Sequence, residues 1–303
     1  MVESLAIGVD IGGSHITSAI VDLNSQCILM PTINRRSVNA MAGAEEIISA
    51  WSSVIAQSCH QLAQQPVKIG IAMPGPFDYE EGIAYMQEQN KYDALYGLNI
   101  KSLLSEKLSI ERNNISFMND AACFLKGEVF GGAAKGCHKV LGLTLGTGFG
   151  SAVYHNNFVY DANLWCDPYA GGIAEDLFST RWFVKRYFEL TQQMVVDVKE
   201  MMDNAEVDLV KRIFHEFGRN LGLYLRSIQN KFDFETVVVG GNIAKSFALF
   251  VGALQQEFLH QNLQVDVKPA ILNEDAALLG AASVWKTSVV NPVTINQKKP
   301  ATI

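Results

Sequence analysis

Two carboxylates in this chain follow strand-like runs and are placed where they could do chemistry. Asp10 ends the apolar run "LAIGVD" just before Gly12-Gly13-Ser14, and Asp120 follows "ISFMN" at the start of a helical run. A carboxylate next to a phosphate site can bind a divalent cation, and one within reach of a hydroxyl can accept its proton. Helix capping also explains Asn119 and Asp120, since both residue types are good N-caps, and capping is compatible with a role as general base.

Glycine-rich turns occur twice, each between two strand-like segments. They are Gly12-Gly13-Ser14 and Gly146-Thr147-Gly148. A turn without Cβ atoms exposes backbone N–H groups that can hold phosphate oxygens. Either turn alone is adequately explained as an ordinary hairpin. Their equivalent places in a duplicated plan favour a polyphosphate held between two domains, with Asp10 close to a Mg²⁺ ion that the phosphates and water also coordinate.

Other phosphate and metal motifs are missing from the sequence. There is no GxxxxGK[ST] and no GxGxxG after the first strand-like run, which excludes P-loop and dinucleotide-binding signatures. The five cysteines show no CxxC or CxC spacing, which is typical of reduced cysteines in a cytoplasmic protein. No signal peptide and no run of about 18 apolar residues is visible, so no membrane association is expected.

The positions of these motifs depend on strands and helices that alternate along the chain. Strand-like runs at 4–12, 15–23 and 27–35 precede a helical pattern over 43–64 and a buried strand over 67–78. From residue 139 the order of strand, glycine turn and strand restarts, and helical patterns cover 174–189, 207–229 and 274–287. Strands separated by helices indicate an α/β protein. The repeat predicts two related domains that face each other.

Composition agrees with a globular protein and argues against nucleic-acid binding. Of the 303 residues 49% are hydrophobic and 18% charged, and the net charge is −7. A chain of this length is expected to form two domains. Nucleic-acid binders usually have a basic face, and no run of Lys and Arg here is longer than a pair such as Lys298-Lys299, so no nucleic-acid partner is expected.

Taken together, the motifs resemble those of the ROK family (repressors, open reading frames and sugar kinases), a branch of the actin-like/hexokinase ATPase superfamily. The matching segments, in order, are "DIGGSHITSAIVD", "IGIAMPGPFD", "NDAACFLKGEVFGGA", "LTLGTGFGSA", "VVVGGNIA" and "EDAALLGAA". The resemblance implies two actin-like (ribonuclease H-like) domains with a cleft between them. We expect an N-terminal α/β domain over 1–118 and a C-terminal α/β domain over 119–289. A tail over 290–303 follows, for which packing back onto the N-terminal domain is one arrangement.

The resemblance also implies a cytoplasmic, ATP-dependent and Mg²⁺-dependent sugar kinase that forms a homodimer. Asp120 would be the general base that accepts the proton of the attacking sugar hydroxyl. The sugar would be bound by the substrate-binding set Gly75, Pro76, Asn90, Asn119 and Glu175, with Asp176 competing for the place of Glu175. The nucleotide would be bound by Asp10, which also holds Mg²⁺, by both glycine turns, and by the adenosine loop Gly240, Gly241 and Asn242.

One segment departs from the family pattern. Many members carry Glu-x-Gly-His followed by a cysteine cluster that binds structural zinc, whereas "FVYDANLWCDPYAGGIAEDLFS" has one cysteine, Cys166, and no histidine. A zinc site needs three or four such ligands, so no zinc is expected. Asp161, Asn163 or Trp165 could replace the missing sugar-binding groups, and the identity of the sugar stays open among glucose, fructose, mannose, allose and N-acetylated amino sugars.

Two other functions are compatible with this sequence. A sugar-responsive regulator without catalysis is one, but the first phosphate loop begins at Asp10, where no helix-turn-helix module is expected to fit before it. A degenerate kinase is the other; the intact Asp120 and both glycine turns argue against it, and the altered segment 155–175 argues for it. A heat-shock-type ATPase is disfavoured, since 303 residues are not expected to hold the additional substrate domain of that class.

Overall fold

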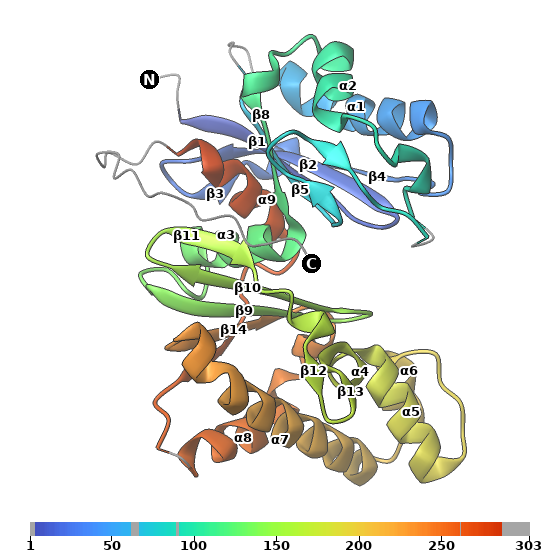
Figure 1. The fold of residues 1–303 in the computed structure, drawn as a ribbon, viewed down its shortest axis with the longest axis vertical. Helices are drawn as coiled ribbons and strands as arrows, with labels where there is room; N and C mark the ends of the chain where they lie inside the picture. The colour runs from blue at the N-terminus through green and yellow to red at the C-terminus, as the bar shows by residue number, and fades with distance from the viewer. Residues whose placement is uncertain (1–3, 62–66, 89–90, 261, 287–303) are drawn as a thin grey trace.

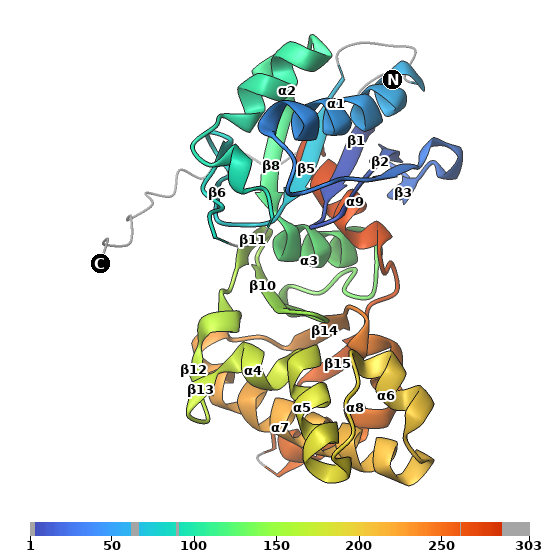
Figure 2. The ribbon, with the colours of Figure 1, turned by 90° about the vertical axis from the view of Figure 1, so that its right-hand side faces the viewer.

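The computed structural model describes residues 4–61, 67–88, 91–260 and 262–286 as two α/β halves stacked along the long axis of the molecule (Figure 1). The first half is built on a six-stranded sheet. Its strands are β1 (Leu5–Ile11), β2 (His15–Asp22), β3 (Cys27–Ile28), β4 (Asn34–Ser37), β5 (Ile69–Met73) and β8 (Ile115–Asn119). The order is β3-β2-β1-β5-β8, with β4 also paired to β2. Helices α1 (Ala44–Gln61) and α2 (Ile100–Leu108) lie on its outer face (Figure 2).

The second half repeats this plan. Its five-stranded sheet has the order β11-β10-β9-β14-β15. The strands are β9 (Lys139–Leu145), β10 (Phe149–His155), β11 (Phe158–Asp161), β14 (Thr236–Gly240) and β15 (Asp266–Pro269). An antiparallel hairpin followed by two parallel strands forms each sheet: β1-β2 then β5 and β8 in the first, β9-β10 then β14 and β15 in the second. The duplication predicted from the two glycine turns is therefore present.

Helices α4 to α8 cover the outer face of the second sheet. They are α4 (Ala174–Phe178), α5 (Thr180–Thr191), α6 (Val198–Asn204), α7 (Val207–Phe232) and α8 (Phe247–Leu259). Rings of Phe178, Phe183, Phe214, Phe217 and Tyr224 from these helices are fully buried against it. Burial of this aromatic layer stabilises the sheet against the helices. It thereby fixes the position of the turns at the ends of the strands.

Two helices lie between the sheets and join the halves. α3 (Asp120–Gly131) follows β8 directly, and α9 (Asp275–Ala282) returns from the second half to pack on β1 and β5 of the first sheet. The helices cross closely, since a Cβ on Gly127 would lie 1.9 Å from the carbonyl oxygen of Ala276. The predicted boundary near residue 118 lies at the end of β8. The boundary stays a prediction, and the tail over 290–303 lies outside the described residues.

Two predicted elements differ from those observed. The strand expected over 27–35 breaks into β3, a 3₁₀ turn (Met30–Thr32) and β4. Pro31 cannot donate to a strand ladder, and the Thr32 hydroxyl instead accepts the N–H of Ile20 at 2.9 Å. The helix expected over 174–189 divides into α4 and α5 because Ser179 is extended. No helix of the described residues is long and apolar enough to span a membrane.

Candidate functional site

Asp10 and the first glycine turn lie at the end of the β1-β2 hairpin. The N–H of Gly12 donates to the carbonyl of His15 at 2.9 Å, and the Tyr92 hydroxyl donates to the carbonyl of Gly12 at 2.6 Å. These two bonds fix the turn. The N–H groups of Gly13 and Ser14 have no acceptor among the described residues, so they are available to an anionic ligand.

Asp10 is a partly buried carboxylate that receives no hydrogen bond and no ion pair from any described residue. Burial, and then the charge of Asp120, raise the pKa of Asp10 to about 6, although Arg35 opposes the rise. Since the charge of Asp120 acts on Asp10, the two acids predicted from separate motifs lie in one electrostatic environment. A divalent cation would relieve the cost of ionising Asp10, so this residue fits a Mg²⁺ ligand.

The second glycine turn closes the β9-β10 hairpin in the same way. The N–H of Gly146 donates to the carbonyl of Gly148 at 3.1 Å, and Thr180 donates to the carbonyl of Gly146 from its N–H at 2.8 Å and its hydroxyl at 3.0 Å. Within the described chain the N–H groups of Thr147 and Gly148 have no acceptor. The start of α5 therefore supports a turn whose free amides resemble those of the first.

The predicted adenosine loop lies beside this second turn. β14 ends at Gly240, Gly241 has a φ of 89°, and Asn242 leads into a 3₁₀ turn (Ile243–Ser246). A Cβ on Gly241 would lie 2.3 Å from the carbonyl oxygen of Leu145, the last residue of β9. Both the positive φ and this close approach require glycine at position 241. The loop and the second turn thus form one continuous edge of the second sheet.

Asn119 and Asp120 stand where β8 ends and α3 begins. The Asn119 carbonyl oxygen Oδ1 accepts the N–H of Ala122 at 3.0 Å, and Asp120 Oδ1 accepts the N–H of Ala121 at 2.8 Å. Asn119 therefore caps α3, its amide nitrogen remains able to donate to the Tyr79 hydroxyl, and the second Asp120 oxygen accepts no hydrogen bond from a described residue. The cap thereby orients both side chains at the level where the two halves meet.

The turn at Gly75 and Pro76 follows β5 and lies next to Asn119 through Tyr79. The Tyr79 hydroxyl donates to the carbonyl of Met73 at 3.2 Å and accepts a hydrogen bond from the Asn119 amide nitrogen at 3.3 Å. A Cβ on Gly75 would lie 3.2 Å from the same hydroxyl oxygen. The short hairpin of β6 (Phe77–Asp78) and β7 (Ile83–Ala84) carries Tyr79 in its loop. Sequence reasoning missed Tyr79, because a tyrosine in a turn carries no motif.

Glu175 lies beside the second glycine turn. Its Oε2 accepts the N–H of Phe149 at 3.0 Å, its other oxygen forms an ion pair with Arg181, and a Cβ on Gly148 would lie 2.9 Å from Oε2. Asp176, the competing residue, instead accepts the N–H of Ile173 at the start of α4. Asn90, also predicted to bind the sugar, lies outside the described residues.

The segment that departs from the family pattern forms β11 and the hairpin of β12 (Pro168–Tyr169) and β13 (Gly172–Ile173). Asp161 is half-buried, and the charge of Asp120 contributes to raising its pKa after the larger effect of burial. Asn163, Trp165 and Cys166 are exposed. Among the described residues no three His, Cys, Asp or Glu side chains are grouped to hold a metal ion. Of Asp161, Asn163 and Trp165, it is Asp161 whose pKa is raised in part by the charge of Asp120.

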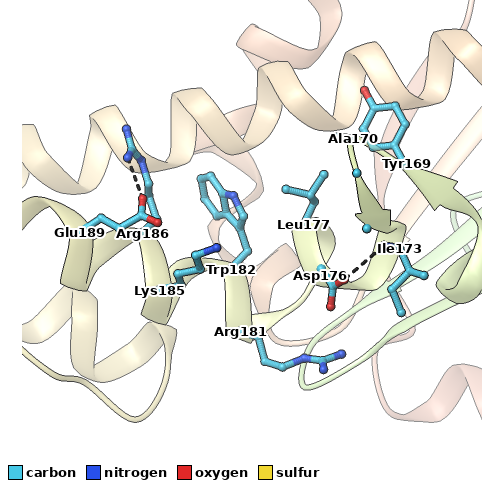
Figure 3. A pocket seen from close by; sticks show the side chains of 12 residues that line it. Tyr169, Ala170, Ile173, Asp176, Leu177, Arg181, Trp182, Lys185, Arg186 and Glu189 are labelled. Atoms are coloured by element: carbon cyan, nitrogen blue, oxygen red, sulfur yellow. Dashed lines mark hydrogen bonds and ion pairs between the residues drawn. The ribbon is translucent and has the colours of Figure 1, made fainter.

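Two hollows adjoin these elements. One of about 570 Å³ lies next to the second turn, where Thr147 and Lys185 line it together with the apolar Val184, Phe188 and Met194. The other, of about 420 Å³, lies between the β12-β13 hairpin and α5, and Asp176, the competitor of Glu175, is among the residues that line it (Figure 3). The first hollow offers an apolar surface beside the second glycine turn, as ligand pockets commonly do.

Comparison with known proteins shows which family this chain belongs to and which proteins it resembles. The model of the ROK family matches residues 6–163 and 166–288. The chain is 23% identical to a glucokinase of Thermotoga maritima, covering 93% of this chain and 98% of the relative. It is also 22% identical to the xylose repressor of Bacillus subtilis, covering 96% of this chain and 79% of that protein. A ROK family glucokinase from Streptomyces griseus, solved with glucose and AMPPNP, superposes with a TM-score of 0.70 at 21% identity over 92% of this chain and 98% of that one.

Proposed function

The chain belongs to the ROK family and has its two-domain actin-like fold, and on that premise we propose that it is an ATP-dependent kinase acting on a hydroxyl of a hexose or hexose derivative. The observation that carries the proposal is that Asp10, beside a glycine turn with free N–H groups, lies close enough to Asp120 for the charge of Asp120 to raise its pKa. An isolated carboxylate near free amides suits a metal–polyphosphate ligand, and a second carboxylate nearby suits a base.

The proposed reaction assigns one task to each part of the site. Gly13, Ser14, Thr147 and Gly148 would donate N–H groups to the phosphate oxygens, and Gly241 would let the nucleotide approach the backbone. Asp10 would hold Mg²⁺, whose charge would neutralise the phosphate oxygens during transfer of the γ-phosphoryl group. In the glucokinase from Streptomyces griseus, the structure contains glucose and the ATP analogue AMPPNP, which supports this pair of ligands.

The acceptor would be activated by Asp120. Its free carboxylate oxygen would accept the proton of the attacking hydroxyl, while Asn119, Gly75, Pro76, Asn90 and Glu175 would border the sugar. Helix α3 fixes Asp120 through its cap, so the base would meet the substrate with little loss of side-chain entropy. The similarity to a glucokinase of Thermotoga maritima supports a sugar as acceptor, and the roles of the individual residues are our proposal.

A sugar-binding regulator without catalysis is the second candidate. The similarity to a xylose repressor and the altered segment 155–175 favour it. An assay of ADP release, with Mg-ATP and a panel of neutral hexoses and N-acetylated amino sugars, separates the two functions. Sugar-dependent ADP release that is lost in Asp120→Asn supports the kinase. A sugar that raises the melting temperature without any ADP release supports the regulator and refutes the kinase.

We further propose that the enzyme works as a cytoplasmic homodimer that does not bind nucleic acid. The family resemblance supports the dimer, the net charge of −7 supports the lack of nucleic-acid binding, and all five cysteines are free thiols, which supports a reducing compartment. Sedimentation velocity gives the oligomeric state, and a monomer at micromolar concentration refutes the dimer.

A further inference from the structure

Tyr79 lies in the middle of the predicted sugar-binding residues, although no motif points to it. Its hydroxyl contacts the Asn119 amide at 3.3 Å and lies beside Gly75, and both residues belong to the predicted acceptor site. The ring is held at a tilt against Phe77, with centroids 5.4 Å apart, so the hydroxyl has a fixed position. Burial is the main cause that raises the pKa of Tyr79, so the group remains a neutral phenol that can both donate and accept hydrogen bonds.

Asp161 approaches the same place from the second half of the molecule. It ends the edge strand β11 opposite Ala152 of β10, and α3, which carries Asp120, packs against both strands (Figure 1). The charges of Asp120 and Asp161 both act on Tyr79, which is consistent with the packing of α3 against β11 and with the three side chains lying near one another. One Asp161 oxygen accepts the N–H of Asn163 in its own turn at 2.7 Å, and no described cation pairs with the carboxylate.

Burying half of a carboxylate costs hydration free energy, and without a counterion few interactions within the protein offset that cost. A ligand that donates hydrogen bonds would supply what the protein does not. Resting on the proposed kinase function, we propose that Tyr79 and Asp161 are substrate-binding residues that hold hydroxyls of the acceptor sugar on either side of Asp120. Asp161 belongs to the segment 155–175 that lacks the Glu and His of other family members.

This arrangement also specifies the class of sugar. The carboxylates of Asp161 and Asp120 offer hydrogen-bond acceptors, so they favour ring positions that bear O–H or N–H donors. Their negative charges repel an anionic substituent on the sugar. The acceptor is therefore a neutral hexose or N-acetyl hexosamine, and a uronic acid is excluded.

The test uses the full-length protein with the variants Tyr79→Phe and Asp161→Asn. Tyr154→Phe and Asp203→Asn serve as matched controls, since the Tyr154 hydroxyl donates to Asn157 in its own hairpin and Asp203 is exposed on α6. Steady-state kinetics and calorimetric titration measure D-glucose, D-mannose, N-acetyl-D-glucosamine and D-glucuronate. We expect the KM or Kd for the preferred neutral sugar to rise about tenfold or more in Asp161→Asn and about threefold to tenfold in Tyr79→Phe.

The same variants separate binding from a structural role. Binding by these residues requires that the KM for Mg-ATP stay within about twofold of wild type while the KM for sugar rises. Unchanged sugar KM and Kd in both variants, an equal rise in the control variants, or D-glucuronate binding as tightly as glucose would each overturn the proposal. If wild type binds a neutral hexose without phosphorylating it, the kinase function fails, and the Kd values of the variants still decide this inference. If wild type binds no hexose in the panel, both are refuted.

Discussion

Replacing Asp10 with Asn is expected to stabilise the free protein while it removes activity. The pKa of Asp10 is raised from 3.8 to about 6, and this difference corresponds to about 3 kcal/mol at pH values above both figures. The folded protein prefers the protonated acid, so ionisation destabilises the native state progressively as the pH rises from about 4 to about 6. Asn has the shape of the acid and cannot ionise, so Asp10→Asn avoids this cost.

The magnitude and its pH dependence can both be measured. At pH 7.5, without Mg²⁺ or nucleotide, we expect Asp10→Asn to exceed wild type by up to about 3 kcal/mol, seen as a melting temperature several degrees higher. At pH 4.5 the difference should fall to about 1 kcal/mol, because wild type is then largely protonated at Asp10. Asp203→Asn is the control for loss of one surface charge, and its melting temperature should not change with this pH profile.

Ligands should reverse the order of stability. Mg²⁺ with ADP favours ionised Asp10, so it should raise the melting temperature of wild type more than that of Asp10→Asn. Two results would refute this reasoning about Asp10 as a buried carboxylate without a counterion. One is an Asp10→Asn protein that is no more stable than wild type at pH 7.5. The other is a difference in melting temperature between the two proteins that does not vary with pH.

Four further substitutions test other parts of the structure. Asp120→Asn should lower turnover by a factor of about 10² to 10⁴ while sugar binding measured by calorimetry persists, and near-normal turnover would show that Asp120 is not the base. Gly241→Ala forces a Cβ to 2.3 Å from the carbonyl oxygen of Leu145 at a φ of 89°, so we expect a loss of more than about 2 kcal/mol of stability. Gly252→Ala in α8, where a Cβ meets nothing within 4 Å, should instead stabilise by up to about 1 kcal/mol, and equal effects at both positions would contradict the close-packing argument. Glu128→Ala should lower the free energy of unfolding by about 3 kcal/mol or more, as measured by thermal denaturation. The reason is that this fully buried carboxylate accepts the N–H groups of Ala133 at 2.7 Å and Leu272 at 2.9 Å. A loss below about 1 kcal/mol would mean that water takes over these hydrogen bonds.

The sequence was most informative where local chemistry and long-range structure coincide. A glycine turn between two apolar runs can form only a tight hairpin, so the two hairpins and their free amides were predictable from residues 5–22 and 139–155. The cap at Asn119 also needs only neighbouring residues. These features placed Asp10 and Asp120 at strand ends, and the structure brings them together.

Other features depend on contacts between distant residues and could not be predicted. Tyr79 reaches Asn119 across 40 positions of sequence, and nothing in a turn sequence indicates where its ring points. The break in the strand over 27–35 depends on the Thr32 hydroxyl meeting the N–H of Ile20, which is a tertiary contact. Asp161 was one of three open alternatives, because only the packing of α3 on β11 distinguishes it from Asn163 and Trp165.

The most direct test of the central claim is ³¹P NMR of Mg-ATP mixed with the protein and one neutral hexose at a time. If the protein is a sugar kinase, the γ-phosphate signal of ATP is replaced by an equal amount of a sugar phosphomonoester, together with ADP, for at least one hexose. The signal should stay unchanged with Asp120→Asn over the same period. Two results would contradict the claim that Asp120 is the base for phosphoryl transfer from ATP to a sugar hydroxyl. One is inorganic phosphate as the only new product, and the other is an unchanged ATP spectrum with every hexose.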